Sequence, residues 1–473
     1  MENQKYDYGM IGLGTMGRNL VLNISDHGYT VSGFDKSNPQ VEAFKKETNG
    51  RNLFATTDLD EFTKSLKSPR VIMMLVPAGK IVDEVIEELK PFLLEDDLLI
   101  DCGNSHFTDT NVRIGQLTQS AIHFMGIGIS GGEHGARYGP SIMPGGSKNA
   151  YERVAPMLQA ISAKINNEPC VMWLGPDSAG HYVKMVHNGI EYGLMQLISE
   201  SYHLLKEVGE FTNDEMHSIF SKWNDGRLRS FLIEITASIF TQKDELTKSH
   251  LIDVILDSAH QKGTGGWTSA NAMNLQVPIP VIDASVAMRN LSAYKKDRQK
   301  ASQKLKGSDV KFQGEKNELV NWLEGSLYFS MITTYAQGMG LLGVASSEYN
   351  YDLKLESIAK IWRGGCIIRS SLLEDIQLAF TRSPSLPNLL LSDVFSQKLS
   401  LTQNGIRKII QIGIETGTPL PALMGSLAYY DSYRSGWLPA NLIQAQRDYF
   451  GAHTYERNDR EGTFHTNWNQ EKE

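Results

Sequence analysis

The sequence predicts an N-terminal α/β domain built on a doubly wound parallel sheet, followed by a large all-α domain and a C-terminal tail. In the first third, short apolar runs alternate with helix-like stretches, which is typical of parallel βαβ units. Helical periodicity then dominates, until the last stretch becomes rich in Gly, Pro, Asn, aromatic and charged residues. We expect the divisions to fall at residues 1–177, 178–434 and 435–473.

Apolar runs in the first third are predicted as strands: Tyr8–Ile11, Thr30–Phe34, Val71–Val76, Leu98–Asp101 and Ile122–Phe124. Helices are expected between them, for example over Gly17–His27 and Lys80–Lys90. Since strand and helix alternate, the crossovers should be right-handed. Further on, Leu319–Leu342 has the apolar periodicity of one long helix. The tail from Ser435 cannot bury much by itself, so we expect it to lie against another surface.

Composition excludes several classes of protein. The chain has 473 residues, a formal net charge of −8 and no basic block, which argues against a nucleic-acid partner. Apolar runs fall short of the roughly 18 residues that suggest a membrane span. The polar opening MENQKYDYGMIG leads straight into a strand, so no secretory signal is expected. Cys102, Cys170 and Cys366 are too scattered for a disulfide framework or a zinc site, which favours the reduced cytoplasm.

A glycine-rich turn follows the first predicted strand and opens the first predicted helix. It consists of Gly12, Leu13, Gly14, Thr15, Met16 and Gly17. The first glycine permits a tight turn, the second lets the backbone approach a pyrophosphate, and the third allows close helix–strand packing. Free N–H groups at the helix start favour phosphate. Together with Asp35 after the second strand, the turn predicts a Rossmann-like dinucleotide site.

The residues after the second strand give conflicting signals about which dinucleotide binds. Asp35 is suited to accept hydrogen bonds from a ribose 2′-hydroxyl, which favours NAD. Lys36 and Ser37 are suited to hold a 2′-phosphate, which favours NADP. A carboxylate repels a phosphate beside it, so these residues leave NADP and NAD both open.

Two more glycine-rich stretches, DCGNS from Asp101 and GISGGEHGARYGPSIMPGG from Gly128, lie where strands should end. Ligands of doubly wound sheets bind beyond the carboxyl ends of the strands. Four residues there are therefore candidates to meet a hydroxylated ligand beside the cofactor: Asn104, Ser130, Gly131 and Gly132. Ordinary turn chemistry explains any single one of them equally well.

The stretch KMVHNGIEYG places five polar side chains on one stripe of a helix: Lys184, His187, Asn188, Glu191 and Tyr192. That spacing normally belongs to buried apolar residues, so the stripe faces either water or a cleft. Gly189 and Gly193 each cost about 1 kcal/mol relative to Ala in a helix. Small residues suit a place where a ligand or another backbone comes close, which favours the cleft.

Lys184 and Glu191 lie roughly 10 Å apart along the helix axis. A substrate of sugar-acid length fits between them, with a different proton donor at each end. Lys184 acts as a general base only when neutral, which requires roughly 4–5 kcal/mol to bring its pKa from about 10.4 to about 7. His187 and Asn188 suit substrate orientation better than catalysis.

Taken together, these motifs resemble the 6-phosphogluconate dehydrogenase family along essentially the whole chain. The stretches that carry the resemblance are GLGTMG, DCGNS, SGGEHGARYGPSIMPGG, KMVHNGIEY, DSAHQKGTGGWT and QAQRDYFGAHTYER. The resemblance implies oxidative decarboxylation of 6-phospho-D-gluconate to ribulose 5-phosphate and CO₂ in the pentose phosphate pathway, with reduction of NADP and no metal. It also implies that Lys184 takes the proton of the C3 hydroxyl of the sugar acid, and that Glu191 protonates C1 of the enediol that remains after CO₂ has left.

The resemblance further implies a substrate site and a homodimer. The residues expected to hold the sugar acid are Asn104, Ser130, Gly131, Gly132, His187 and Asn188. Tyr192, Lys262 and Arg289 are expected to bind its phosphate. Arg447 and His453, from the C-terminal tail of a partner subunit, are expected to complete that pocket.

Departures from the family pattern concern the cofactor site, which the resemblance places at the glycine turn, Asp35–Ser37, Val76, Pro77, Ala78 and Asn104. NADP-dependent relatives usually have Asn-Arg-Thr in place of Asp35-Lys36-Ser37, and Lys in place of Pro77. Both changes make the pocket less cationic. The family favours NADP, with NAD as the alternative. An expected lysine is Gly266 here, so no role is assigned to that position.

Two other functions compete with this interpretation. A related β-hydroxyacid dehydrogenase would oxidise without losing CO₂, but such relatives usually lack the long helical region and the tail. A non-enzymatic dinucleotide-binding regulator would have no need of Lys184, Glu191 and the cationic phosphate set.

Overall fold

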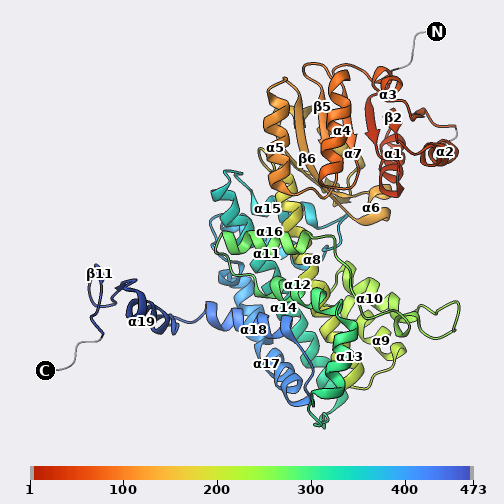
Figure 1. Cartoon of the computed structure of the whole chain (residues 1–473). Coiled ribbons are helices and arrows are strands. Elements are labelled where there is room, and N and C mark those ends of the chain that lie inside the picture. The colour runs from red at the N-terminus through yellow and green to blue at the C-terminus, as the bar shows by residue number, and fades with distance from the viewer. Residues whose placement is uncertain (1–4, 49, 469–473) are drawn as a thin grey trace. The chain divides into compact units, whose positions relative to one another are not determined.

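The computed structural model describes residues 5–48 and 50–468 (Figure 1). The chain forms two compact units, which divide after Ser426. The first contains the predicted α/β part and the helical part, and the second contains the tail. The expected divisions at 1–177, 178–434 and 435–473 stay a prediction, and residues 469–473 of the tail lie outside the described residues.

The α/β part is built on a seven-stranded sheet in the order β3-β2-β1-β4-β5-β6-β7. Its strands are β1 (Tyr8–Ile11), β2 (Val31–Phe34), β3 (Leu53–Thr56), β4 (Val71–Met74), β5 (Leu98–Asp101), β6 (His123–Ser130) and β7 (Ser141–Gly145). Strands β1 to β6 run parallel, which confirms the doubly wound sheet. Strand β7 was not among the predicted strands, and it pairs antiparallel with β6. With Pro144 and Gly145 in five residues, β7 carries a weak strand signal and suits an edge.

Helices cover both faces of this sheet (Figure 1). They are α1 (Thr15–Asp26), α2 (Asn38–Glu47), α3 (Leu59–Ser65), α4 (Lys80–Leu89), α5 (Phe107–Thr118), α6 (Gly132–Tyr138) and α7 (Lys148–Ile161). Alternate strand residues point to opposite faces. Met10 and Met73 thus join the apolar cluster of α1, α2 and α7, whereas Ile11 and Ile72 join that of α3, α4 and α5. Burial on both faces explains why the strands are continuous apolar runs.

The rest of the first unit is helical, apart from the small hairpin of β8 (Lys164–Ile165) and β9 (Glu168–Pro169). Its helices are α8 (Ala179–His203), α9 (Asn213–Asn224), α10 (Phe231–Thr241), α11 (Thr264–Asn274), α12 (Pro280–Ser292), α13 (Lys295–Lys304), α14 (Lys316–Glu348), α15 (Leu355–Trp362), α16 (Leu372–Arg382) and α17 (Asp393–Thr416), and α18 (Pro421–Tyr433) follows. The predicted helix over Leu319–Leu342 is confirmed as part of α14. Every residue from Gly325 to Met339 is buried, as expected for a central helix.

Glycines bring α8 directly against the edge of the sheet. A Cβ added at Gly180 would lie 2.4 Å from the carbonyl oxygens of both Gly126 and Met143. One added at Gly128 would lie 2.3 Å from Cβ of Lys184. Such distances leave no room for a side chain, so the backbone of α8 lies on β6 and β7. This contact places Lys184 over the sheet edge.

The second unit contains α19 (Ala440–Gly451), β10 (Tyr455–Glu456) and β11 (Thr463–Phe464). Its centre is the carboxylate of Asp448, which is fully buried. This carboxylate accepts hydrogen bonds from the main-chain N–H groups of Thr454 and Thr466 at 2.9 and 3.0 Å, and from Nε1 of Trp468 at 2.8 Å. Nδ1 of His465 lies 2.8 Å from it. The tail is therefore organised by a buried charge.

Within the described residues, no helix is both long enough and apolar enough to cross a bilayer. Cys102, Cys170 and Cys366 are buried free thiols.

Replacing Gly180 with Ala should weaken the fold because the added methyl would meet two carbonyl oxygens that belong to the sheet. We expect the free energy of unfolding to fall by about 3 kcal/mol, the upper range for overpacking. Gly115→Ala in α5 is the matched control, since the described chain has no heavy atom within 4 Å of its added Cβ. The free energy of unfolding of Gly115→Ala should rise by up to about 1 kcal/mol, because Ala favours a helix over Gly. Equal denaturation midpoints for the two variants would contradict this account of the helix–sheet contact.

Candidate active site

The α8 stripe, which comprises Lys184, His187, Asn188, Glu191 and Tyr192, points into the protein. Lys184 is 6% exposed, His187 is fully buried, and Asn188 and Tyr192 are also buried. Glu191 retains 22% of its side-chain exposure. The stripe therefore does not face bulk water, and its polar groups must find partners inside.

The imidazole of His187 lies at the centre of this stripe. Its Nδ1 is 3.5 Å from Nζ of Lys184, 3.2 Å from Oδ1 of Asn188 and 3.9 Å from a carboxylate oxygen of Glu191. Its Nε2 is 3.3 Å from Oγ of Ser130, at the end of β6. Lys184 and Glu191 lie two turns apart on α8. Nevertheless, the amine of Lys184 and a carboxylate oxygen of Glu191 both lie within 4 Å of Nδ1 of His187.

The loop after β5 meets the stripe from the nucleotide side. Nδ2 of Asn188 donates a hydrogen bond to Oδ1 of Asn104 at 3.5 Å. A small pocket lies between this loop, α8 and the start of α11, and its lining is Asn104, Ser105, His181, Lys184, Met185, Asn188, Thr264 and Trp267. The structure thus brings Asn104 together with Lys184 and Asn188.

Burial sets the protonation of the stripe. It lowers the pKa of Lys184, against the opposing attraction of Glu191. It raises the pKa of Glu191, against the opposing effects of Lys184 and Arg289. Burial, reinforced by Lys184, holds the pKa of His187 well below its usual value. Each shift moves its group toward the uncharged form. For Lys184 this is the form that a general base needs, and for Glu191 it is the form that a general acid needs.

Sequence reasoning missed the end of α15 and the residues that follow it, which pack against the site. The ring of Trp362 contacts that of His187 edge-on, with ring centroids 5.5 Å apart. Gly131 has a φ of +114°, and a Cβ there would lie 2.5 Å from the carbonyl oxygen of Gly365. Burial raises the pKa of Cys366 to about 12, and nearby Lys184 opposes the shift. The adjacent glycines in WRGGC were the available signal.

Gly189 and Gly193 have a different role from the predicted one. A Cβ at Gly189 would lie 2.6 Å from the methyl group of Thr268, and one at Gly193 would lie 2.7 Å from that of Thr334. These glycines therefore accommodate threonine side chains of α11 and α14. The interpretation that they make room for a ligand or another backbone is wrong.

The glycine turn after β1 fits a pyrophosphate. Gly12 has a φ of +95°, and a Cβ at Gly17 would lie 1.9 Å from the carbonyl oxygen of Gly12. Gly14 has open space around it, with no described heavy atom within 4 Å of an added Cβ. No described side chain caps the start of α1, where Thr15 and Met16 present their N–H groups. The turn thus leaves backbone donors open to an anion.

The residues after β2 and β4 border the same turn. Each carboxylate oxygen of Asp35 accepts a main-chain N–H at 2.8 Å, one from Leu13 and one from Ser37. Asp35 therefore shapes the turn. Lys36 forms an ion pair with Glu88 at 2.6 Å, in which both side chains are well exposed. After β4, Val76 is half-buried, whereas Pro77 and Ala78 are exposed.

Of the predicted phosphate set, the structure brings together Tyr192 and Arg289. The guanidinium of Arg289 stacks on the Tyr192 ring, 3.5 Å from its centroid. Lys262 is exposed just before α11. Arg447 and His453 belong to the second unit, where Arg447 donates to Gln444 at 3.0 Å and His453 packs on Phe450. Gly132 has a φ of +62° at the start of α6.

These features define the class of the protein as a dinucleotide-dependent dehydrogenase. A Rossmann-like sheet presents an open glycine turn, and a helical region presents a buried amine beside a carboxyl group with a raised pKa.

Comparison with known proteins identifies the family. Residues 7–175 match the family model described as the NAD binding domain of 6-phosphogluconate dehydrogenase, and residues 180–468 match the C-terminal domain of the same enzyme. The chain belongs to the 6-phosphogluconate dehydrogenase family.

Individual relatives agree over nearly the whole chain. The NADP(+)-dependent, decarboxylating 6-phosphogluconate dehydrogenase of Bacillus subtilis is 54% identical over 98% of this chain and 99% of the relative. The decarboxylating enzyme of Lactococcus lactis is 49% identical over 98% of each chain. Among solved structures, 6-phosphogluconate dehydrogenase of Plasmodium falciparum, determined in apo form and with NADP+ or 6-phosphogluconate, aligns with a TM-score of 0.95. It is 42% identical and covers 98% of this chain and all of its own.

Proposed function

We propose that this protein catalyses the oxidative decarboxylation of 6-phosphogluconate to ribulose 5-phosphate and CO₂ with reduction of NADP, a reaction of the pentose phosphate pathway. The observation that carries the proposal is the meeting of Lys184 and Glu191 at one buried imidazole, beside the loop of Asn104. The names and the high identity of the relatives support the same substrate and cofactor.

Lys184 begins the reaction as a neutral amine. Its lowered pKa lets it take the proton of the C3 hydroxyl. NADP, when bound, accepts the hydride from C3. The amine is then an ammonium group, which stabilises the negative charge that develops on the C3 oxygen as CO₂ leaves.

Glu191 completes the reaction as an acid. After CO₂ leaves, C1 of the enediol needs a proton, and the raised pKa of Glu191 keeps one available. The substrate's hydroxyl and carboxylate groups meet Asn104, Ser130, Gly131, Gly132, His187 and Asn188. These residues orient the sugar acid between the two proton-transfer groups.

The residues after β2 support NADP. A 2′-phosphate placed there would meet Lys36, Ser37 and the start of α2, and the exposed Lys36–Glu88 pair costs little to break. Asp35 directs its carboxylate to two main-chain N–H groups, which compensate its charge. NAD remains the alternative, because Asp35 and Pro77 stand where NADP-dependent relatives usually have other residues.

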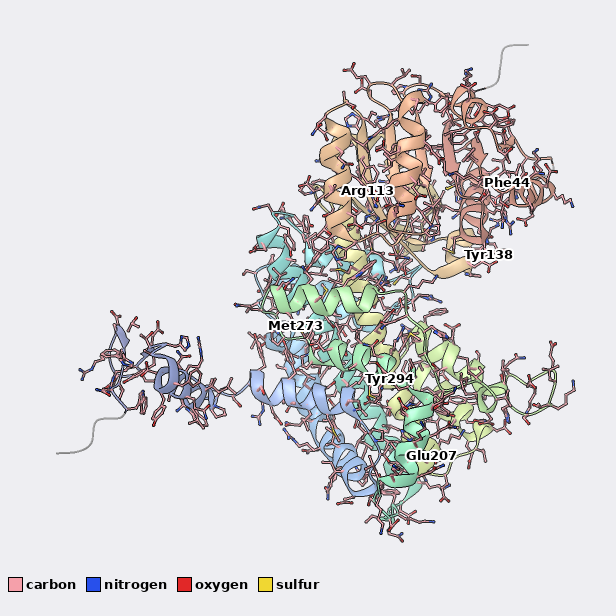
Figure 2. The ribbon with its side chains drawn as sticks, in the orientation of Figure 1. Phe44, Arg113, Tyr138, Glu207, Met273 and Tyr294 are labelled. Atoms are coloured by element: carbon pink, nitrogen blue, oxygen red, sulfur yellow. The ribbon has the colours of Figure 1, made fainter. Side chains whose placement is uncertain are left out.

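We further propose a homodimer in which the tail completes the partner's phosphate site. Arg447 and His453 of the tail would join Tyr192, Lys262 and Arg289 of the other subunit. Large apolar side chains of the tail support docking, since Trp437, Leu442, Ile443 and Phe450 are each more than 60% exposed. The helical region also exposes apolar side chains, including Met273 and Tyr294 (Figure 2). We place the protein in the cytoplasm, where its free thiols stay reduced.

Incubating the protein with 6-phosphogluconate and each cofactor, while following reduced nicotinamide and CO₂, tests the function. We expect equal amounts of both products, and faster turnover with NADP than with NAD. Lys184→Met should lower kcat by roughly 10²- to 10⁴-fold. NADPH should still bind to this variant, as measured by fluorescence. Reduction without CO₂ would instead indicate a β-hydroxyacid dehydrogenase. No reaction with either cofactor would indicate a non-enzymatic regulator.

The pH dependence of kcat/KM tests the role of Glu191. Activity should rise with pH as the proton that blocks Lys184 is lost, and fall again once Glu191 can no longer hold its proton. The two apparent pKa values belong to the coupled pair. Glu191→Gln should lower kcat by roughly 10²- to 10⁴-fold and abolish the falling limb, so that the remaining activity reaches a plateau.

Glu200→Gln is the control for the pH profile. Burial raises the pKa of Glu200 to about 7 on the same helix, but its carboxylate accepts the N–H groups of Ala422 and Leu423. This variant should keep both limbs. A falling limb that persists in Glu191→Gln but disappears in Glu200→Gln would remove Glu191 from the role of acid.

Mixing two inactive variants tests the shared site. Lys184→Met and Arg447→Ala should each be inactive alone. In a mixed dimer, however, one site has both an intact Lys184 and an intact partner tail. Random exchange makes half of the dimers mixed, so about one quarter of wild-type activity should return. Lys184→Met mixed with Glu191→Gln should recover none, because both residues belong to the same subunit's half of the site. No recovery in the first mixture would refute the shared site.

A further inference from the structure

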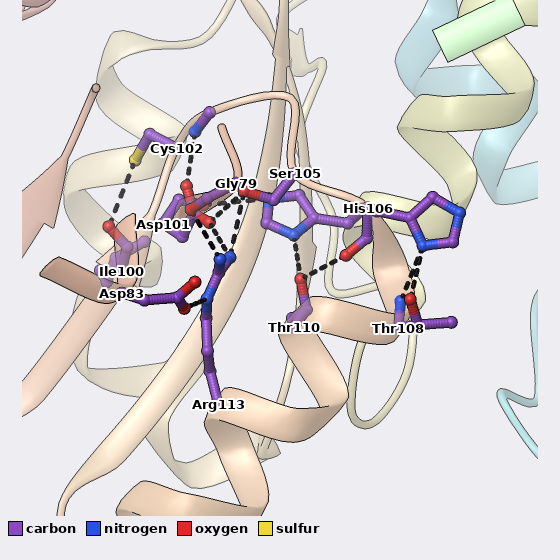
Figure 3. Close-up of polar contacts among 12 residues, drawn as sticks. Gly79, Asp83, Ile100, Asp101, Cys102, Ser105, His106, Thr108, Thr110 and Arg113 are labelled. Atoms are coloured by element: carbon purple, nitrogen blue, oxygen red, sulfur yellow. Dashed lines mark hydrogen bonds and ion pairs between the residues drawn. The ribbon is translucent and has the colours of Figure 1, made fainter. Parts of the chain in front are cut away.

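A buried carboxylate organises the loop that carries Asn104. Asp101, the last residue of β5, is fully buried. Its Oδ1 accepts the main-chain N–H of Gly103 at 2.9 Å, and its Oδ2 accepts the hydroxyl of Ser105 at 2.5 Å (Figure 3). Asn104 lies between these two partners. The carboxylate thus fixes the backbone on both sides of Asn104.

Arg113 of α5 connects this loop to the loop after β4. Its side chain is 2% exposed. Nη1 donates to Asp101 at 3.4 Å and to Oγ of Ser105 at 3.3 Å, Nη2 donates to the carbonyl oxygen of Gly79 at 3.0 Å, and Nε donates to Asp83 at 2.6 Å (Figure 3). One guanidinium therefore holds the loop of residues 76–79 and the loop of residues 102–105 together.

The two loops adjoin each other directly. A Cβ added at Gly103 would lie only 3.2 Å from the carbonyl oxygen of Val76. Both loops follow carboxyl ends of parallel strands, where ligands of this fold bind. Their relative position therefore shapes the floor of the cofactor site.

The same network reaches α8. Nε2 of His181 lies 3.2 Å from the carbonyl oxygen of Asp101, and its Nδ1 lies 2.7 Å from Oγ1 of Thr110 in α5. His181 is 1% exposed and precedes Lys184 by three residues, so the two share one face of the helix. Asp101 therefore contacts both the loop that carries Asn104 and the helix that carries Lys184.

A buried ion pair is weak evidence for stability alone, because well-packed apolar residues often stabilise a core as much or more. A guanidinium does something that an apolar side chain cannot: its rigid fork fixes several acceptors at once. Here the acceptors come from α4, from the end of β5 and from both loops. The arrangement suits precise placement of the loops.

We propose that Arg113 is a positioning residue for hydride transfer, which holds the loops of residues 76–79 and 102–105 in the register that aligns cofactor, Asn104 and Lys184. The inference rests on the proposed function. Arg113 touches no reacting atom and acts through Asp101, Ser105 and Gly79.

Arg113→Lys tests this role, because lysine keeps the charge but has a single nitrogen in place of the fork. The matched control is Arg70→Lys. Arg70 pairs with the fully buried Asp97 at 2.9 Å. These two residues directly precede β4 and β5, so they lie at the amino ends of the same two strands whose carboxyl ends carry the loops. The two variants should lose similar thermal stability. Only Arg113→Lys should lower kcat, by on the order of 10- to 100-fold, with little change in the KM for 6-phosphogluconate.

Hydrogen–deuterium exchange gives a readout that does not depend on activity. With NADPH bound, peptides that contain residues 76–79 and 102–105 should exchange faster in Arg113→Lys than in Arg70→Lys or in the wild type. Wild-type kcat in Arg113→Lys, unchanged exchange in these loops, or an equal loss of kcat in Arg70→Lys would each overturn the inference. If the wild type fails to oxidise 6-phosphogluconate, the proposed function falls, and this inference falls with it.

Discussion

Burial of the Lys184 amine is the constraint on which the rest of the site depends. In water, the amine would be an ammonium group at neutral pH and could not accept a proton. Desolvation lowers its pKa, and desolvation requires α8 to lie directly on the sheet edge. The close approach of α8 to β6 and β7 at Gly126, Gly128 and Gly180 makes this possible. The close contact between α8 and the sheet therefore both packs the fold and lowers the pKa of the Lys184 amine.

The same burial acts with the opposite sign on Glu191, whose pKa rises. A neutral amine and a neutral carboxylic acid are together one proton transfer away from an ammonium–carboxylate pair, so desolvation and mutual attraction compete for the same proton. His187 lies against both groups and stays neutral. Because the ring between them carries no charge, it does not fix the protonation of Lys184 or Glu191, and a bound substrate can change both. A solvent-filled cleft would remove this balance, because water would restore the usual charge of each group.

Features that depend on neighbouring residues in the chain could be predicted from sequence. The glycine turn at Gly12, the stripe beginning at Lys184 and the central part of α14 are of this kind, because each is a repeat or a turn with a local signature. Features that depend on distant segments could not. Trp362 meets His187 across 175 residues of sequence, and Gly189 and Gly193 receive threonines from two other helices. Arg113 gathers acceptors from two other stretches of the chain, residues 79–83 and 101–105. No periodicity in one stretch encodes such meetings. Strand β7 was missed for another reason, since its pairing with β6 overrides the weak propensity of its own residues.

The tail illustrates how a segment without an apolar core can still be ordered. Its buried carboxylate, Asp448, accepts main-chain N–H groups on both sides of the β10–β11 hairpin, and its neighbour in sequence is Arg447. Ordering a flexible arm on binding costs conformational entropy for each residue that becomes fixed. A tail organised before docking avoids much of that cost, which matters because its proposed role is to deliver two side chains to a pocket that another subunit builds. The exposed apolar residues of α19 would then provide the driving force for docking, and the polar centre would set the geometry in which Arg447 and His453 arrive.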